Sequence, residues 1–345
     1  MRKLATIRVV KDIMPIKDAD NIELALIDGW QCVIKKNTLQ KGDPVVYFEI
    51  DSLLPIEDRY EFLRKSCYKK LTYTTDNGTE EGFLLRTMRF KGSLSQGLAL
   101  PLADFADLNK HKVGDDVTEK LNIVKYDPPL PARIAGNIKG KFPSFIPKTD
   151  EPRIQNMPDL FNSSLKGLEF ECTEKLDGTS MTVYFNDGLF GVCSRNFELH
   201  DTEDNSLWRI VRSLNILDLM TQLGQNIALQ GELVGPGIQK NPLRLGNIQF
   251  HVFNIWHIDK QSYLCPLDRY RLLDYLGIES VPILYDDLKV FENFKNVNEI
   301  LDFASGPSLL NPNVKQREGL VFKATDAIEQ MISFKAVNNE YIIRR

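Results

Sequence analysis

Hydrophobic and polar positions alternate in short runs along the first third of the chain, and turn residues separate the runs. The Asp28-Gly29 dipeptide between two of them is typical of a two-residue hairpin turn. About five short strands at this spacing predict a small barrel, and an OB-type barrel fits their number. The runs that we interpret as strands are Ala5–Val10, Glu23–Ile27, Trp30–Ile34, Val45–Ile50, Gly82–Arg86 and Leu98–Pro101.

Proline and glycine become frequent between residues 127 and 149, which predicts a linker. We therefore expect a barrel domain at 1–126, a linker at 127–149 and a second domain at 150–345. In the second domain, apolar residues recur at helical spacing over 207–223 and again over 267–276. The other apolar runs indicate strands, so the predicted fold class is α+β, an OB-type barrel followed by a mixed α/β domain.

Composition narrows the class of protein. The chain has 345 residues, of which 43% are hydrophobic, as in soluble globular proteins with room for two domains. Neither an apolar run of membrane-spanning length nor a signal peptide is present, so we expect an intracellular protein, cytoplasmic or nuclear. The five scattered cysteines predict neither a disulfide framework nor a zinc site. With a net charge of −4, any nucleic-acid contact needs a local basic patch.

A lysine between two predicted strands is the strongest candidate for chemistry. Residues 174–178 read Glu-Lys-Leu-Asp-Gly, with strand-like runs at 168–173 and 179–185. A lysine amine attacks only when deprotonated, so burial or a nearby cation must lower its pKa from about 10.4. Gly178 would let a bulky ligand approach the backbone. The alternative interpretation is a hairpin with a solvated lysine.

Other segments of the second domain carry residues that suit a nucleotide site. Arg195 follows a predicted strand and can bind a phosphate or ribose, and Glu232 lies in a glycine-rich frame where it can hold a ribose hydroxyl or hydrated Mg²⁺. An aromatic residue of the run 250–256 can stack on a nucleobase. Lys323 and Lys335 can hold phosphate oxygens. Each also has an ordinary alternative: a surface arginine, a strand-end glutamate, a core ring, or solvated lysines.

Taken in chain order, six motifs resemble the collinear motifs of the covalent nucleotidyltransferases, which include polynucleotide ligases and mRNA capping enzymes. The wording at 150–156, 235–241 and 333–341 is similar to ATP-dependent RNA ligases, of the type with an N-terminal OB domain known from Deinococcus and Naegleria. In DNA ligases and capping enzymes an OB domain follows the last motif, whereas here the predicted barrel precedes the first. The six motifs are Lys175-x-Asp177-Gly178, Ser194-Arg195-Asn196, Gly231-Glu232, Val252-Phe253, Glu318-Gly319 and Phe334-Lys335.

The resemblance implies a nucleotidyltransferase (adenylyltransferase) domain and an enzyme that uses ATP and Mg²⁺ or Mn²⁺. Such an enzyme seals 3′-hydroxyl and 5′-phosphate ends of RNA through a covalent lysyl-AMP intermediate and an adenylylated 5′ end. Its expected partner is RNA, or an RNA-containing duplex with a nick, in RNA repair, and we expect a monomer. The alternatives are a capping-type guanylyltransferase and a non-catalytic RNA-binding OB protein.

The resemblance also implies a role for each residue that would contact the nucleotide. Lys175 would attack the α-phosphorus of ATP, and Lys335 would bind the α-phosphate. Glu174 and Phe253 would recognise the adenine, with Phe253 stacking on it. Arg195 would contact ribose or phosphate.

The remaining roles that the resemblance implies concern metal and phosphate. Asp177, Glu232 and Glu318 would anchor water molecules around a catalytic Mg²⁺. Arg153 would hold another ATP phosphate or the incoming 5′-phosphate.

Two positions depart from the family pattern. Ser333 stands where many relatives have the first lysine of a Lys-x-Lys motif, so either Lys323 substitutes for that phosphate contact or the contact is weaker here. Asn254 stands where relatives often have an acid, so a carboxylate contact is in doubt there.

Overall fold

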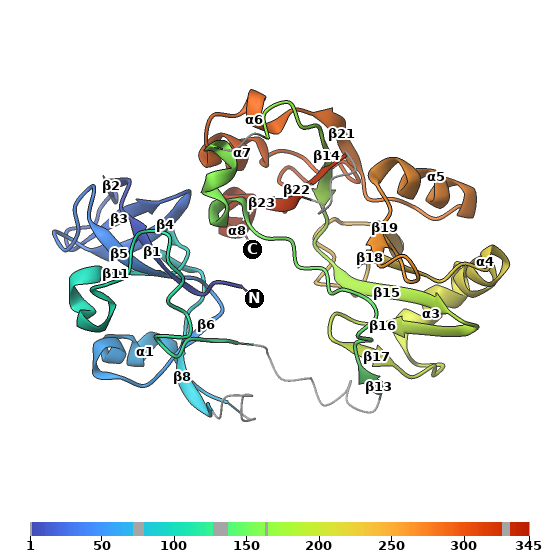
Figure 1. Cartoon of the computed structure of the whole chain (residues 1–345), viewed down its shortest axis with the longest axis horizontal. Helices are drawn as coiled ribbons and strands as arrows, with labels where there is room; N and C mark the ends of the chain where they lie inside the picture. Colours follow the sequence, from blue (N-terminus) through green and yellow to red (C-terminus); the bar gives the residue numbers. More distant parts are fainter. Residues whose placement is uncertain (1, 72–78, 127–136, 163–164, 326–331, 345) are drawn as a thin grey trace. The chain divides into compact units, whose positions relative to one another are not determined.

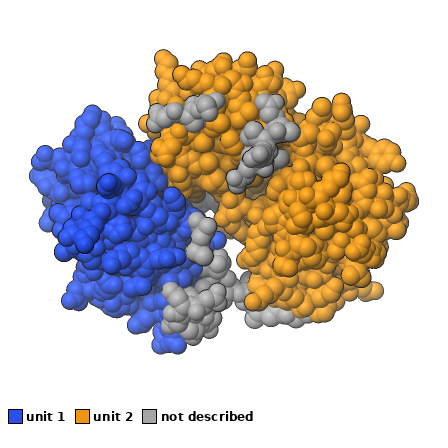
Figure 2. All heavy atoms as spheres, viewed as in Figure 1, with its two compact units in different colours: residues 1–130 blue, residues 131–345 orange. Residues whose placement is uncertain are grey.

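The computed structural model describes residues 2–71, 79–126, 137–162, 165–325 and 332–344. The chain forms two compact units, Met1–Leu130 and Pro131–Arg345 (Figure 2). Residues 127–136 of the predicted linker lie outside the described residues, whereas β13 (Ile138–Lys141) pairs with a strand of the second unit. The predicted domain boundaries therefore stay a prediction. None of the described helices is long and apolar enough to cross a membrane.

The first unit consists mainly of short antiparallel strands (Figure 1). Its sheets have the strand orders β1-β5-β11, β2-β3-β4, β12-β6-β8-β7 and β10-β9. The strands are β1 (Ala5–Val9), β2 (Asp12–Pro15), β3 (Ile22–Ile27), β4 (Trp30–Lys35), β5 (Pro44–Phe48), β6 (Ser52–Leu54), β7 (Tyr68–Lys70), β8 (Glu81–Leu84), β9 (Met88–Phe90), β10 (Ser93–Ser95), β11 (Leu98–Pro101) and β12 (Val124–Lys125). The helical segments are η1 (Asp58–Leu63), α1 (Arg64–Cys67), η2 (Leu102–Asp104) and η3 (Ala106–Leu108).

The predicted hairpin and all six predicted strands of this unit are confirmed. Asp28 and Gly29 both have positive φ angles, 47° and 82°, as a two-residue hairpin turn requires. Directly after the turn, the fully buried Trp30 stacks on Tyr47 with ring centroids 5.6 Å apart. Several of the shorter strands, such as the three-residue β6, were not predicted because so short a run shows no periodicity.

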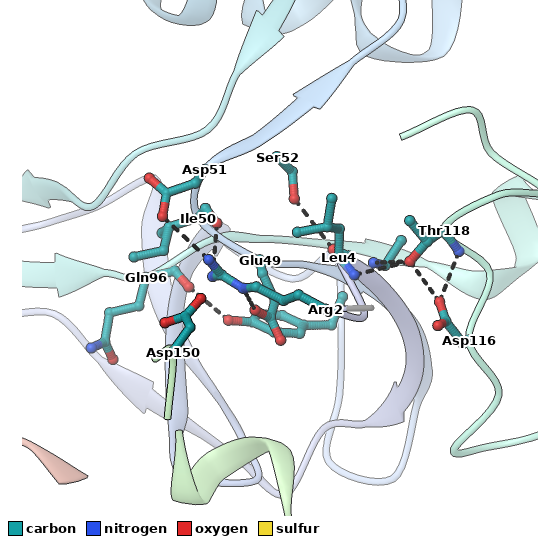
Figure 3. A network of polar contacts seen from close by, with 12 residues as sticks. Arg2, Leu4, Glu49, Ile50, Asp51, Ser52, Gln96, Asp116, Thr118 and Asp150 are labelled. Atoms are coloured by element: carbon teal, nitrogen blue, oxygen red, sulfur yellow. Dashed lines mark hydrogen bonds and ion pairs between the residues drawn. The ribbon is translucent and has the colours of Figure 1, made fainter. Parts of the chain in front are cut away.

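A polar network ties the N-terminal segment of this unit to two other parts of it (Figure 3). Arg2 donates from Nε to the buried carboxylate of Glu49 over 2.8 Å. The hydroxyl of Thr118 accepts from the backbone N–H of Leu4 over 2.9 Å and donates to Asp116. Because the carboxylate and hydroxyl are buried, these bonds fix the path of the chain into β1.

The second unit contains two separate sheets (Figure 1). A seven-stranded sheet has the order β13-β17-β16-β15-β18-β19-β20, and a four-stranded sheet has the order β21-β14-β22-β23. The strands after β13 are β14 (Phe170–Lys175), β15 (Thr179–Asn186), β16 (Leu189–Cys193), β17 (Phe197–Leu199), β18 (Ile227–Val234), β19 (Gln249–His257), β20 (Ser262–Tyr263), β21 (Ile283–Leu288), β22 (Gly319–Ala324) and β23 (Ser333–Val337). The helical segments are η4 (Ile154–Asn156), η5 (Pro158–Asn162), α3 (Ser206–Ser213), α4 (Ile216–Leu223), α5 (Pro266–Leu276), α6 (Val290–Asn293), α7 (Val297–Phe303) and α8 (Asn339–Arg344).

Each sheet has its own hydrophobic core. Helices α3, α4 and α5 pack on the seven-stranded sheet through residues such as Trp208, Met220 and Leu273. Helices α6 and α7 pack on the four-stranded sheet, where Phe291 and Phe334 share a core. Most apolar packing is therefore made between each sheet and its own helices.

The predicted helical stretch 207–223 is two helices, α3 and α4, so its prediction as one continuous element was wrong. Asn215 adopts the left-handed conformation with φ of 52°, which breaks the helix. Asn205 caps the start of α3, since its side chain accepts from two backbone N–H groups. The predicted helix over 267–276 is confirmed as α5, which ends at Gly277, where the backbone has a left-handed φ of 64°.

Candidate active site

Lys175 lies at a corner where the chain passes from one sheet to the other. It is the last residue of β14 in the four-stranded sheet, and β15 begins at Thr179 in the seven-stranded sheet. The intervening Leu176 is 4% exposed and packs in a small apolar cluster. Strands β14 and β15 do not pair, so the alternative interpretation as a hairpin with a solvated lysine was wrong.

Gly178 allows this corner to press against β18. A Cβ at this position would lie 2.2 Å from the Leu233 carbonyl oxygen and 3.0 Å from Cγ of Glu232. Only glycine fits so close a contact without a shift of the backbone. We expected Gly178 to admit a ligand, but the group that approaches it is the protein's own strand.

Lys175 forms an ion pair with Glu318, the residue before β22. Its Nζ lies 2.6 Å from Oε1 of Glu318, and Lys175 pairs with the adjoining Gly319 in the β14–β22 ladder. The second carboxylate oxygen of Glu318 is buried and has no hydrogen-bond partner among the described residues. A buried, unpaired carboxylate oxygen is costly, so this atom suits a further cationic or hydrogen-bonding partner.

Two more carboxylates belong to the surroundings of Lys175. Burial raises the pKa of Glu232 to about 7, with the charges of Glu318 and Asp177 adding to the effect and Lys175 opposing it. The hydroxyl of Tyr341 on α8 donates a hydrogen bond to Asp177.

These three carboxylates fit a hydrated divalent cation. Their mutual repulsion favours a cation nearby, and Mg²⁺ often keeps several water ligands. Among the residues that the structure describes, no three His, Cys, Asp or Glu side chains converge closely enough to hold a metal ion directly.

Basic side chains also lie near Lys175. Burial lowers the pKa of Lys335, and the charges of Lys175 and Arg153 lower it further, while Asp150 opposes them. Arg153 and Lys335 are bridge partners, so the segment before η4 lies beside β23. Asp150 accepts from Nζ of Lys335 over 3.1 Å and lies 3.7 Å from Nη2 of the exposed Arg195. An anion already bridges these two cations, so the position suits a phosphate.

Glu174 and Phe253 lie at another side of the corner. Glu174 is 2% exposed and accepts from the backbone N–H of Leu309 over 2.6 Å, and burial raises its pKa. The neighbouring Leu310 and the half-buried ring of Phe253 belong to the apolar cluster of Leu176. An apolar cluster with a half-exposed aromatic ring suits a nucleobase.

Lys323 is buried rather than open to a phosphate. Its Nζ donates to the Phe253 carbonyl oxygen and to Oδ1 of Asn254, each over 2.6 Å. Ser333 donates to the carboxylate of Glu151. The two positions that depart from the family pattern, 254 and 333, are therefore both engaged in hydrogen bonds within the protein.

Sequence reasoning gave no role to several residues that shape this site. Asp150 and Tyr341 lie within motifs that carried the resemblance, so their positions were the available signal. The buried Arg269 of α5, which contacts the Phe253 carbonyl, lies on a helix that gave no chemical signal. Its partner Glu171 alternates with core residues on β14, and only the fold reveals the pair.

Comparisons with known proteins agree with this fold. A profile of an OB-fold domain matches residues 4–102, and a profile of the RNA ligase family matches residues 168–337. No curated protein matches the chain.

Solved structures of the Naegleria gruberi RNA ligase are similar to the whole chain at 44% sequence identity. The alignment with a lysine-to-methionine variant, solved with AMP and Mn, covers 100% of this chain and 99% of the Naegleria chain, with a TM-score of 0.84. A lysine-to-alanine variant with ATP and Mn gives coverages of 99% for both chains and a TM-score of 0.84. The alignment with a structure that contains PPi covers 100% of this chain and 99% of the Naegleria chain, with a TM-score of 0.83. The predicted family and fold class are confirmed, and the chain belongs to the RNA ligase family, with an OB-fold domain preceding its nucleotidyltransferase domain.

Proposed function

We propose that this protein is an ATP-dependent RNA ligase that works through a covalent AMP adduct on Lys175. The observation that carries the proposal is the corner lysine itself, paired with Glu318 and flanked by the charges of Lys335 and Arg153. The similar Naegleria ligase has been solved with ATP, with AMP and with PPi, which correspond to the nucleotide species of an adenylylation step.

In the first step, Nζ of Lys175 attacks the α-phosphorus of ATP. The Lys175 ammonium first gives one proton to the paired carboxylate of Glu318 or to solvent. A nitrogen–phosphorus bond then forms, the bond to the β-phosphate oxygen breaks, pyrophosphate leaves, and the attacking nitrogen gives its second proton to solvent. Glu318 accepts a hydrogen bond from the amine at 2.6 Å and so holds it in place for attack. Lys335 and Arg153 supply positive charge where negative charge develops on the phosphates.

Asp177, Glu232 and Glu318 would hold Mg²⁺ or Mn²⁺ through water. When bound, the cation supplies charge that stabilises the phosphates and lowers the pKa of a neighbouring amine. Apart from any metal, Tyr341 orients the carboxylate of Asp177, and the contact at Gly178 fixes the corner against Glu232.

The nucleotide would lie with its adenine against Phe253, within reach of Glu174, and with ribose or phosphate near Arg195. In the second step, an oxygen of the RNA 5′-phosphate attacks the AMP phosphorus and Lys175 leaves as an amine. In the third step, the RNA 3′-hydroxyl attacks the activated 5′-phosphate, which forms the phosphodiester and releases AMP. Each step is an in-line displacement, so positioning and charge stabilisation supply the catalysis.

The substrate class that we propose is RNA, or an RNA-containing duplex with a nick, in a repair role. The OB-fold domain supports this choice, since OB folds bind oligonucleotides. We also propose that the enzyme is intracellular and that it is a monomer. Light scattering of the purified protein would test the monomeric state.

Radiolabelled ATP followed by a denaturing gel tests the central assignment. Wild-type protein should retain label, Lys175→Ala should not, and the exposed Lys295→Ala should label like wild type. Normal labelling of Lys175→Ala would show that the nucleophile lies elsewhere. Labelling by GTP in place of ATP would instead indicate a guanylyltransferase.

A further inference from the structure

The ring assigned to the nucleobase lies at an irregularity in β19. In the ladder with β18, Asn254 pairs with Gln230 and Val252 pairs with Gly231, so Phe253 is an extra residue without a partner in β18. Such a bulge changes the direction of a side chain and leaves backbone groups outside the ladder. The Phe253 carbonyl therefore needs hydrogen-bond donors from elsewhere.

Two buried cations supply those donors. Nζ of Lys323 donates to the Phe253 carbonyl over 2.6 Å, and Nη1 of Arg269 donates to the same oxygen over 3.2 Å. A carbonyl oxygen has two lone pairs, so both are used. Lys323 Nζ also lies 5.4 Å from the centroid of the Phe253 ring, within range of a cation–π interaction.

Each cation is itself held by a partner. Arg269 forms a two-pronged ion pair with Glu171 at 3.0 and 2.6 Å, and Lys323 donates to Oδ1 of Asn254 at 2.6 Å. Lys323 and Arg269 are each 2% exposed, so neither reaches solvent. Burial also lowers the pKa of Lys323 to about 8. Buried charges are retained only where hydrogen bonds compensate them, and here they converge on one backbone oxygen.

This arrangement joins the two sheets at the nucleobase side of the site. Glu171 and Lys323 are neighbours in the β14–β22 ladder of the four-stranded sheet. Phe253 belongs to the seven-stranded sheet, and Arg269 lies on the helix packed against it. The bonds therefore set the position of the Phe253 backbone relative to the strand that ends in Lys175.

We propose that Lys323 is a positioning residue that, together with Arg269, fixes the bulged Phe253 so that its ring can stack on the nucleobase. The inference rests on the proposed function, in which Phe253 contacts adenine. It differs from a phosphate-binding role, because two of the three ammonium protons are donated to Phe253 and Asn254. Lys323 therefore does not replace the lysine that is absent at Ser333.

Binding of ATP and of inorganic tripolyphosphate distinguishes the two roles. Both affinities are measured by calorimetry with Mg²⁺, in a Lys175→Ala background so that no covalent adduct forms. Lys323→Met should weaken ATP binding about 10-fold, because base stacking is weakened, and should leave tripolyphosphate binding within about 2-fold. An equal loss for both ligands would overturn the proposal in favour of a phosphate contact. Lys335→Met is the matched comparison, and it should weaken the binding of both ATP and tripolyphosphate.

A double-mutant cycle then tests whether Lys323 acts through the ring. In a Phe253→Ala background, Lys323→Met should cause no further loss of ATP affinity. Lys323→Gln, which keeps an N–H donor for the carbonyl, should recover part of the affinity. If Lys323→Met does not fold, the cycle uses Lys323→Gln in its place. It then compares Lys323→Gln alone, Phe253→Ala alone and the double variant. Additive losses from the two positions would overturn the proposal.

The same measurements separate failure of this inference from failure of the proposed function. If the protein with native Lys323 binds ATP no more tightly than tripolyphosphate, the nucleobase site itself is wrong. If it prefers ATP and Lys323→Met keeps the full preference, only the positioning role is wrong.

Discussion

Replacing Gly178 with alanine tests whether the contact between the lysine corner and β18 sets the geometry of the site. The new Cβ would lie 2.2 Å from the Leu233 carbonyl oxygen, while ordinary contacts begin near 3.4 Å. The corner and β18 must therefore separate by about 1.2 Å. The φ angle of Gly178 lies outside the left-handed region, so the added methyl group acts through the collision alone.

The separation moves Lys175 and Asp177 away from Glu232. A misplacement of about 1 Å can cost on the order of 100-fold in rate, so the single-turnover rate of enzyme–AMP formation should fall by roughly that factor. Overpacking should also lower the free energy of unfolding by about 1–3 kcal/mol. Quenched-flow labelling with radioactive ATP measures the first effect, and urea unfolding measures the second.

Gly246→Ala is the matched control, since a Cβ there meets no atom within 4 Å and the residue is exposed. This variant should label at the wild-type rate. If folded Gly178→Ala also formed enzyme–AMP at that rate, the close contact would not control the position of the lysine, and the reasoning would be refuted.

Metal dependence, the tyrosine of α8, the buried lysine and the barrel each give a further test. Excess EDTA should abolish labelling of the wild type and added Mn²⁺ should restore it, whereas undiminished labelling in EDTA would contradict a role for a divalent cation. Tyr341→Phe removes the donor to Asp177 and should raise the Mn²⁺ concentration for half-maximal labelling about 10-fold, while the exposed Tyr275→Phe should not. The pKa of Lys323 is about 8 in the folded protein against an ordinary 10.5, so the unfolded chain binds more protons between these values. The free energy of unfolding of the wild type should thus rise by on the order of 3 kcal/mol from pH 8 to 10.5, and that of Lys323→Met should not show this rise. If the urea unfolding midpoints of the two proteins shifted equally over this pH range, the prediction would be wrong. Deleting residues 1–126 should impair nick sealing more than enzyme–AMP formation, because all the site residues lie in the second unit; equal loss in both assays would contradict this division.

The residues nearest the proposed chemistry could be predicted from sequence because each lies at the end of a strand or next to a glycine. Lys175 and Glu318 are such residues, and the β14–β22 register brings them together. In the first unit, β4 followed from alternation, since Trp30, Cys32 and Ile34 are buried on one face, whereas β1 and β5 are buried almost throughout and β5 followed from its continuous apolar run.

Other features depend on contacts between distant segments, which local patterns do not encode. Arg269 and Glu171 are 98 residues apart, and nothing near either residue indicates that both are buried. The bulge at Phe253 adds one residue to an otherwise regular alternation, so the sequence shows a strand and not its shifted register. For the same reason, Lys323 has the pattern of an exposed strand lysine although its ammonium group lies in the interior.

The division of the second unit into two sheets with separate cores has a consequence for its mechanics. Lys175 and Lys335 belong to one sheet, and Glu232 and Phe253 belong to the other, so a nucleotide held by all four residues, as proposed above, would link the two sheets beside the corner at Lys175. At 100 times its Kd, such a ligand adds about 2.7 kcal/mol against any opening that separates them. We therefore expect relative motion of the two sheets to be smallest when nucleotide is bound and largest after AMP has left. Amide hydrogen exchange along β14 and β18 should slow together on loading and recover together on release.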